Sequence, residues 1–469
     1  MTPIGVAILV VLLLVVCLGP RRWALLAVVA GVFYTTQWQS VDLAGLNLFG
    51  LRFLEVAAFG RVVLRRELDF SKLNRLDWTL LLLYNYTAFV WIVRSGEITP
   101  LRIGYAFDPT LWFLALRGLI GTVDEFRWVL YRVVVLLVPY TALVFTERLT
   151  GRTAFGFIGH TQELYVRNGV ARCQGTFRHA VLLGSVAASF LSLYIGLWMG
   201  GSRRAIATLG GVLCLGLVVL SNSGGPAMST AAVALGWFAW RFRHRMSFVR
   251  LAALAVLVLL VIVMKAPIWY LPFKISAVIG GGGYYRGLLM ERAWEHLPNW
   301  GAFGIDIRKT ADWMPTVLDT IGGADVTNQY LVFGLKAGLP AILILVAVLT
   351  LGFIAIGRAV ASVGDDDGAE RPEALTLWGL GVTLFMHAVS WISTSYFDQS
   401  YVIWLVQLAA VSSLTHAVLL RAGERNSEAP SAVTASARHA PRRPGSLRRD
   451  TKPPSRRLAR TRTQPPFRP

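Results

Sequence analysis

Arginine side chains gather in one interval between two apolar stretches of the chain. Residues 146–178 contain five arginines, among them Arg172 and Arg178 in the run RCQGTFRH (172–179). A guanidinium group presents a planar fork of donors to phosphate or carboxylate oxygens. The interval therefore predicts a binding site for an anionic ligand. A solvated basic loop whose arginines pair with Glu147 and Glu163 accounts for the same charges equally well.

A second long polar interval covers residues 266–334 and carries Arg286. Within it, Tyr284 to Leu297 has a helical apolar face, typical of a helix that lies in the lipid headgroup region. The glycines 280–283 before it predict a hinge. Three tryptophans suit the same membrane depth, although they could also bind sugar rings: Trp294, Trp300 and Trp313.

The elements that position these side chains are expected to be membrane helices. Of 469 residues, 55% are hydrophobic and only 15% are charged, and the mean hydropathy is +0.55. This composition indicates a polytopic membrane protein with an all-α transmembrane bundle. The first apolar stretch is followed by Pro20 and two arginines rather than by a cleavage site, so we expect a retained span.

Thirteen segments are expected to cross the membrane within a domain of residues 1–420. With the N-terminus outside, all the short basic loops fall on the cytoplasmic face, as the positive-inside rule requires. Intervals 146–178 and 266–334 then both lie outside the cell membrane. The expected spans are 4–19, 23–38, 46–64, 77–93, 109–122, 127–145, 179–199, 205–221, 226–240, 248–265, 335–357, 375–396 and 399–420.

The segment after the last span has a different composition. Residues 421–469 hold thirteen Lys or Arg and three acidic residues, with few large apolar side chains. We expect a disordered cytoplasmic tail that touches anionic lipid headgroups. A nucleic-acid partner is not expected, because the tail lacks interleaved aromatic side chains. The three cysteines have no metal-binding spacing, and no metal or other cofactor is expected.

Polar residues inside the expected spans give further hypotheses. Arg52 and Glu55 are three residues apart, so they share a helix face where opposite charges can pair. His387, Ser390, Thr394 and Asp398 recur at helical spacing. They predict either a cavity lining or, as the plainer interpretation, a hydrogen-bonded stripe between helices.

Two motifs give the chain a family resemblance. Thr327 and Asn328, followed after nine residues by GLPA (338–341), resemble the His-[Asn/Ser/Gln]-x9-Gly-x-x-Gly signature of the O-antigen ligase and polymerase superfamily. The run RCQGTFRH resembles the Arg-x-x-Gly-x-Phe-x-His segment of that family, and ERLTGR (147–152) precedes it as in exopolysaccharide-associated members. The resemblance extends over residues 45–415. It implies a membrane glycosyltransferase similar to the GT-C class.

Members of that family transfer a glycan from undecaprenyl pyrophosphate to an acceptor hydroxyl at the outer face of the bacterial inner membrane. By this resemblance, Arg172, Arg178 and Arg286 would neutralise the leaving pyrophosphate without a metal, and Asn328 would orient a substrate. Gly338 and Pro340 would form a helix start. Other polysaccharide assembly proteins are possible partners.

The sequence departs from the family pattern at two positions, Thr327 and Ala341. Thr327 stands where the family has its proposed base, and a hydroxyl is no general base near neutral pH. Asp325 is the first candidate for that role, His296 the second and Asp306 the third. Asp325 and Asn328 are equally well explained as residues of a turn or helix cap.

Two classes of function stay open on the sequence. The first is a glycan polymerase or ligase, with the ERLTGR flank favouring a polymerase. The second is a transporter or flippase of lipid-linked glycan or of another anion. No internal repeat with broken helices, typical of a transporter, is visible in the sequence.

Overall fold

The computed structural model describes residues 1–43, 46–201, 203–265, 267–271, 283–314, 318, 322–363 and 370–438. The chain divides into two compact units, residues 1–422 and residues 423–469. Every site considered below belongs to the first unit. Of the predicted glycine hinge, residues 280–282 lie outside the described residues, as do residues 439–469 of the tail.

Helices account for most of the described chain. They are α1 (Pro3–Leu18), α2 (Arg21–Tyr34), α3 (Gly50–Leu64), α4 (Arg75–Ser95), α5 (Pro100–Leu119), α6 (Val123–Thr150), α7 (Ala180–Met199), α8 (Arg204–Leu220), α9 (Gly224–Phe238), α10 (Met246–Val263), α12 (Gly283–Glu295), α13 (Leu297–Trp300), α14 (Gln329–Ser362), α15 (Arg371–Ser390) and α16 (Asp398–Arg438). Short 3-10 helices are η1 (Phe70–Lys72), η2 (Gly156–Ile158), η3 (Ala239–Arg245), η4 (Ile268–Tyr270) and η5 (Ile307–Trp313). Two small hairpins pair β1 (Ser40–Leu43) with β2 (Leu46–Phe49), and β3 (Val166–Arg167) with β4 (Val170–Ala171).

Each of the thirteen segments predicted to span a membrane overlaps one of these helices. In the described ranges, six helical stretches are long and apolar enough to cross a membrane, and α9, η3 and α10 together form one of them. Helices α1 and α8 are shorter apolar helices. The prediction of an all-α, multi-pass architecture is confirmed at this level, whereas thirteen crossings stay a prediction.

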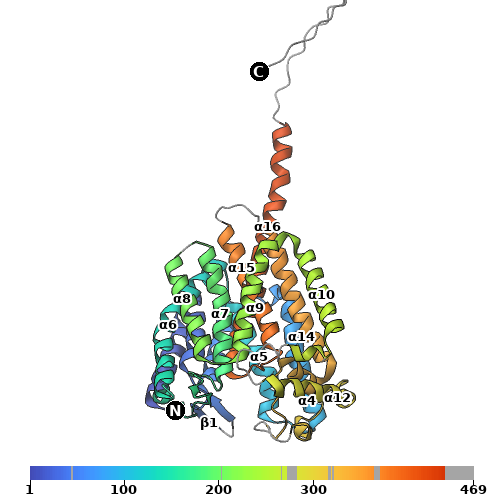
Figure 1. Cartoon of the computed structure of the whole chain (residues 1–469). Helices are drawn as coiled ribbons and strands as arrows, with labels where there is room; N and C mark the ends of the chain where they lie inside the picture. Colours follow the sequence, from blue (N-terminus) through green and yellow to red (C-terminus); the bar gives the residue numbers. More distant parts are fainter. Residues whose placement is uncertain are drawn as a thin grey trace, which may run out of the picture. The chain divides into compact units, whose positions relative to one another are not determined.

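Helix α7 lies inside the bundle, between α8 and α9 in Figure 1, and packs against both and against α15. A Cβ atom on Gly184 would lie 2.5 Å from Pro226 of α9, so glycine permits this close approach. The N-terminus, β1 and α12 all lie at one end of the bundle (Figure 1). Thr2 Oγ1 donates a hydrogen bond to the Phe157 carbonyl at 3.0 Å, which places the loop after α6 at the same end. We call this the loop end.

The second predicted loop folds into a small hydrophobic core of its own. Leu289 and Ala293 of α12 pack with Trp300, Trp313 and residues at the start of α14. Trp300 and Trp313 are 4% and 7% exposed, whereas Trp294 is 63% exposed. Trp300 and Trp313 therefore pack inside the protein, and of the three tryptophans Trp294 is the one open to contact with lipid headgroups. Packing on protein, rather than on lipid, buries the apolar face of α12.

Helix α14 changes direction at Ala337 and Gly338. Gly338 has a φ of +81°, and the adjacent Ala337 also departs from helical geometry. A Cβ atom on Gly338 would collide with the backbone of Ala302, and Leu339 N–H donates to the Gly301 carbonyl at 2.8 Å. The GLPA motif therefore restarts a helix, as the sequence predicts, and Pro340 lies in the first turn after the kink.

The stripe predicted from His387 to Asp398 is interrupted, because α15 ends at Ser390 and α16 begins at Asp398. Thr394 therefore lies in a turn and not on the helix face of His387. His387 itself is within hydrogen-bond distance of Gln407 Oε1 at 2.6 Å and of the Tyr396 hydroxyl at 2.9 Å. The interhelical hydrogen-bond interpretation is confirmed for His387. The helical spacing is wrong for Thr394 and Asp398.

Helix α16 continues to Arg438, into the interval predicted to be an unfolded tail from residue 421. Five alanines in this stretch favour helix, whereas Gly423 and Pro430 disfavour it.

Candidate anion-binding site

Three helices begin close together at the loop end. A Cβ atom on Gly225, in the first turn of α9, would lie 3.2 Å from Val181 of α7 and 3.2 Å from Thr394 in the turn after α15. That same turn holds the start of α14, because Gln329 N–H donates to the Trp391 carbonyl at 2.9 Å. The amino ends of three helix dipoles are therefore neighbours, which favours negative charge there.

Arg172 projects into this region from the loop after α6. Its Nη2 donates to Ser223 Oγ, the N-cap residue of α9, at 2.6 Å. Its Nε atom is buried and has no partner among the described residues. Burial, together with the charges of Arg167 and Arg286, lowers the pKa of Arg172 to about 10. Since buried polar groups are normally paired, the open donor points to a ligand.

The loop that carries Arg172 is fixed by its backbone. Glu147 on α6 accepts the N–H groups of Gln174 and Gly175, each at 3.1 Å. Cys173 N–H donates to the Leu220 carbonyl at 3.1 Å. Glu147 is thus occupied by backbone groups and forms no ion pair with any arginine in the described part of the chain. The interpretation of the arginines as partners of Glu147 is wrong for this reason.

Arg286 reaches the same region from α12, in the other loop. The charge of Arg286 acts on that of Arg172 and lowers its pKa, so an electrostatic interaction links the two side chains. Burial lowers the pKa of Arg286, Arg167 lowers it further, and Asp325 partly offsets the change. We name Arg167, Arg172 and Arg286 the arginine cluster. These like charges repel one another, and an anion bound among them would relieve the repulsion.

Asp325 lies beside this cluster, half-buried, and its backbone carbonyl accepts the Tyr285 hydroxyl at 2.7 Å. Asn328 is the N-cap of α14: its Oδ1 accepts Leu331 N–H at 3.0 Å and its Nδ2 donates to the Ile392 carbonyl at 3.0 Å. The cap interpretation therefore accounts for Asn328. Thr327 Oγ1, by contrast, is buried without a partner among the described residues.

Arg178 and His179 flank the arginine cluster at the start of α7. Arg178 forms an ion pair with Asp398 at 3.1 Å and hydrogen-bonds to Gln37, so its charge is already matched. His179 is exposed at the surface and packs edge-on against Phe397, with ring centroids 5.9 Å apart. Burial of part of the ring lowers the pKa of His179, and the charges of Arg178 and Arg172 lower it further.

The structure does not bring His296 and Asp306 to the cluster. His296 follows the far end of α12 and is about 15 Å from Arg286 along the helix axis, at 1.5 Å per residue. It stacks on Trp313 with ring centroids 4.5 Å apart. Asp306 caps η5 and is paired with Arg308. Both residues therefore have structural roles, and no group of metal-ligating side chains occurs among the described residues.

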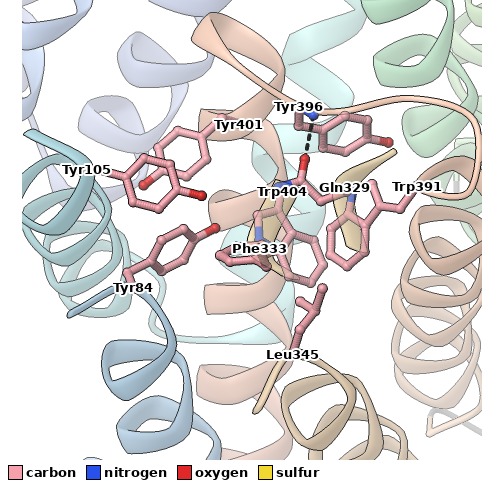
Figure 2. Close-up of a pocket in the computed structure, with 9 residues that line it drawn as sticks. All are labelled: Tyr84, Tyr105, Gln329, Phe333, Leu345, Trp391, Tyr396, Tyr401 and Trp404. Atoms are coloured by element: carbon pink, nitrogen blue, oxygen red, sulfur yellow. Dashed lines mark hydrogen bonds between the residues drawn. The ribbon is translucent and has the colours of Figure 1, made fainter. Parts of the chain in front are cut away.

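Behind the start of α14 lies a small aromatic cavity of about 30 Å³. Gln329, the residue after the Asn328 cap, lines it and accepts Tyr396 N–H at 2.6 Å, as Figure 2 shows. The other lining residues are Tyr84, Tyr105, Phe333, Leu345, Trp391, Tyr396, Tyr401 and Trp404.

Sequence reasoning found the arginines but missed two features of the site. The meeting of three helix starts depends on tertiary packing and has no signal in the sequence. His179 could have been found, since it ends the RCQGTFRH run directly before an apolar span. No protein-family model matches this chain, and no curated protein is significantly similar to it.

Proposed function

We propose that this chain is a metal-independent, inverting glycosyltransferase of the bacterial inner (plasma) membrane, similar to O-antigen ligases and exopolysaccharide polymerases. Its donor would be a glycan on undecaprenyl pyrophosphate and its acceptor a sugar hydroxyl at the outer face, with the tail in the cytoplasm. The observation that supports this proposal is the meeting of Arg172 and Arg286, from separate loops, at three helix starts.

The proposed reaction requires this site to stabilise the charge of the leaving group and to remove a proton from the acceptor. The acceptor oxygen attacks the anomeric carbon as the bond to the diphosphate oxygen breaks, so the leaving group gains negative charge. The arginine cluster and the three helix starts would stabilise that charge. The acceptor hydroxyl must also lose its proton to a base.

Two groups beside the arginine cluster can accept that proton. Asp325 carries a carboxylate that interacts electrostatically with Arg286. His179 is neutral near neutral pH, because its pKa lies below the ordinary value. His179 also interacts with the charge of Arg172, where the leaving group would bind.

The direct test uses purified protein in nanodiscs with an undecaprenyl-pyrophosphate oligosaccharide. Longer lipid-linked chains and free undecaprenyl pyrophosphate are the products to be measured. We expect Arg172→Ala and Arg286→Ala each to lower the rate by about 100-fold or more, as loss of a charge-stabilising donor does. Arg152→Ala is the matched control, because Arg152 lies exposed in the same loop as Arg172.

The outcome decides between classes of function. Wild-type rates in both cluster variants would contradict the proposed role of the arginines. Movement of the lipid-linked glycan across sealed vesicles without chain extension would indicate a transporter or flippase instead. Transfer to a preformed acceptor, rather than chain growth, would separate ligase from polymerase.

A further inference from the structure

Glu55, on α3, is a buried carboxyl group that its neighbours leave partly unpaired. It is 2% exposed, and its Oε1 atom has no hydrogen-bond partner among the described residues. The sequence predicts that Arg52 pairs with it, and this is wrong. Arg52 instead forms an ion pair with Asp108 of α5 at 3.0 Å, because Gly104 leaves room for its guanidinium group against that helix.

The charges around Glu55 do not balance. Asp108 and Arg52 are the charged groups that act on it, and they neutralise each other. Lys336 of α14 is engaged elsewhere, with its Nζ atom 3.8 Å from the ring centre of Tyr105 and 4.4 Å from that of Trp91. One negative charge therefore remains. Burial of an unmatched carboxylate in a helix bundle is costly, so Glu55 needs a positive charge from outside the chain.

Tyr401 carries a neutral oxygen atom that can share such a charge with Glu55. The Tyr401 hydroxyl of α16 is buried without a partner among the described residues, and it interacts electrostatically with Glu55 and Asp108. Tyr401 lines the aromatic cavity together with Tyr84 and Tyr105, whose hydroxyl groups point toward each other in Figure 2. Two buried oxygen atoms without a hydrogen-bond partner among the described residues, one on Glu55 and one on Tyr401, are thus electrostatically linked inside the bundle.

We propose that Glu55 and Tyr401 bind one small positive charge inside the bundle, either a proton or an alkali-metal cation. Access runs past the Arg52–Asp108 pair, whose side chains are 24% and 31% exposed. The site lies apart from the arginine cluster and does not depend on the proposed transfer reaction.

Asp77 of α4 is the internal control for this proposal. It is 0% exposed, as deeply buried as Glu55, but its carboxylate is fully paired. It accepts from Arg117 Nε at 3.1 Å, from Asn74 N–H at 2.9 Å and from Ser412 Oγ at 2.5 Å. Asp77 has no need of a further positive charge.

The first measurement is reaction with dicyclohexylcarbodiimide in nanodiscs, followed by peptide mass spectrometry. A protonated carboxyl adds through its oxygen to the carbodiimide carbon, and the adduct rearranges to a stable N-acylurea. With choline as the sole cation, we expect adduct on Glu55, none on Asp77, and none after Glu55→Gln. Slowing by Na⁺ or K⁺ would identify an alkali-cation site, and no effect of either ion would identify a proton site.

The melting temperature is a second test, which applies even if the reagent cannot reach Glu55. The melting temperature of the wild type should fall, relative to that of Glu55→Gln, as pH rises and the bound proton is lost. Added Na⁺ should reverse that fall if an alkali cation binds. Absence of adduct, together with a melting difference that neither pH nor salt changes, would overturn the proposal.

Discussion

Thr327 and Asn328 are adjacent in the chain and differ in how their polar atoms are used. The Asn328 side chain accepts a hydrogen bond from the Leu331 N–H and donates one to the Ile392 carbonyl. The Thr327 hydroxyl, by contrast, has no partner among the described residues. At the position where the resembling family has a base, this chain therefore carries an unengaged hydroxyl. It suits binding of a substrate better than proton transfer, so the proposed reaction requires a base at another residue.

His179 is the residue whose titration should control that step. Because its pKa is lowered, the ring is neutral and able to accept a proton at neutral pH, and the rate should fall as pH drops through that pKa. We expect His179→Gln to lower kcat and to remove this acidic limb, with added imidazole restoring part of the rate. Asp325→Asn is the comparison variant. A wild-type pH profile in His179→Gln would assign the base elsewhere.

At the scale of elements, Gly338 holds the kink in α14. Its φ of +81° and its contact with the backbone of Ala302 exclude a side chain. We expect Gly338→Ala to lower the free energy of unfolding by about 1 to 3 kcal/mol or to prevent folding. Gly357→Ala in the same helix is the control, since nothing lies within 4 Å of the added atom there. Melting curves in detergent measure both, and equal stability of the two variants would contradict the assignment.

Partly exposed ion pairs join the second loop to the corner between α4 and α5. Arg308 bridges Asp306 and Glu97 at 2.5 and 3.3 Å, and Arg102 binds Glu97 at 2.8 Å. The hydrogen bond from Arg102 lowers the pKa of Glu97, and that from Arg308 lowers the pKa of Asp306. Carboxyl groups with lowered pKa stabilise the fold above their unfolded-state pKa, and this contribution disappears as pH falls through the folded-state value.

Acid should therefore loosen η5 from α4 and α5. We expect faster amide hydrogen exchange in η5 in acid than at neutral pH, after correction for the intrinsic rate. Arg308→Gln should show the same faster exchange already at neutral pH. Arg292→Gln, which removes an exposed pair within α12, is the control. Exchange in η5 that responds to neither acid nor Arg308→Gln would show that these pairs do not hold the loop.

At the scale of the whole molecule, the prediction with the widest consequences is which loops face each side of the membrane. A cysteine replacing Arg152 should react with an impermeant maleimide added outside intact cells. A cysteine replacing the exposed Arg66 should react only after the membrane is opened. Cys17 is exposed and is replaced first, whereas Cys173 and Cys214 are buried. Labelling of both positions from the same side would contradict the predicted topology.

The sequence predicts the helices well and their partners poorly, for a physical reason. Apolar runs mark helices such as α7 because lipid and protein both favour buried apolar surface, whatever the neighbour is. Ion pairing, unlike helix formation, depends on which helices pack together. Arg52 pairs with Asp108, more than fifty residues away, and not with Glu55, which is one turn along its own helix. The same limit applies to Trp300, which the sequence places at the membrane surface and tertiary packing buries. Charge located the arginines, but only three-dimensional packing places the start of α9 beside Arg172.

Helix α14 belongs to two hydrophobic cores at once. Before the kink, Leu331 and Leu335 pack in the core of the second loop, whereas Phe333 and Ala337 pack in the core of the bundle. Unfolding of either core removes packing partners from the same two helical turns, so the loop cannot melt independently of the bundle. Calorimetry should accordingly record one cooperative transition for residues 1–422, and ligand bound near Arg286 should raise the temperature of that single transition.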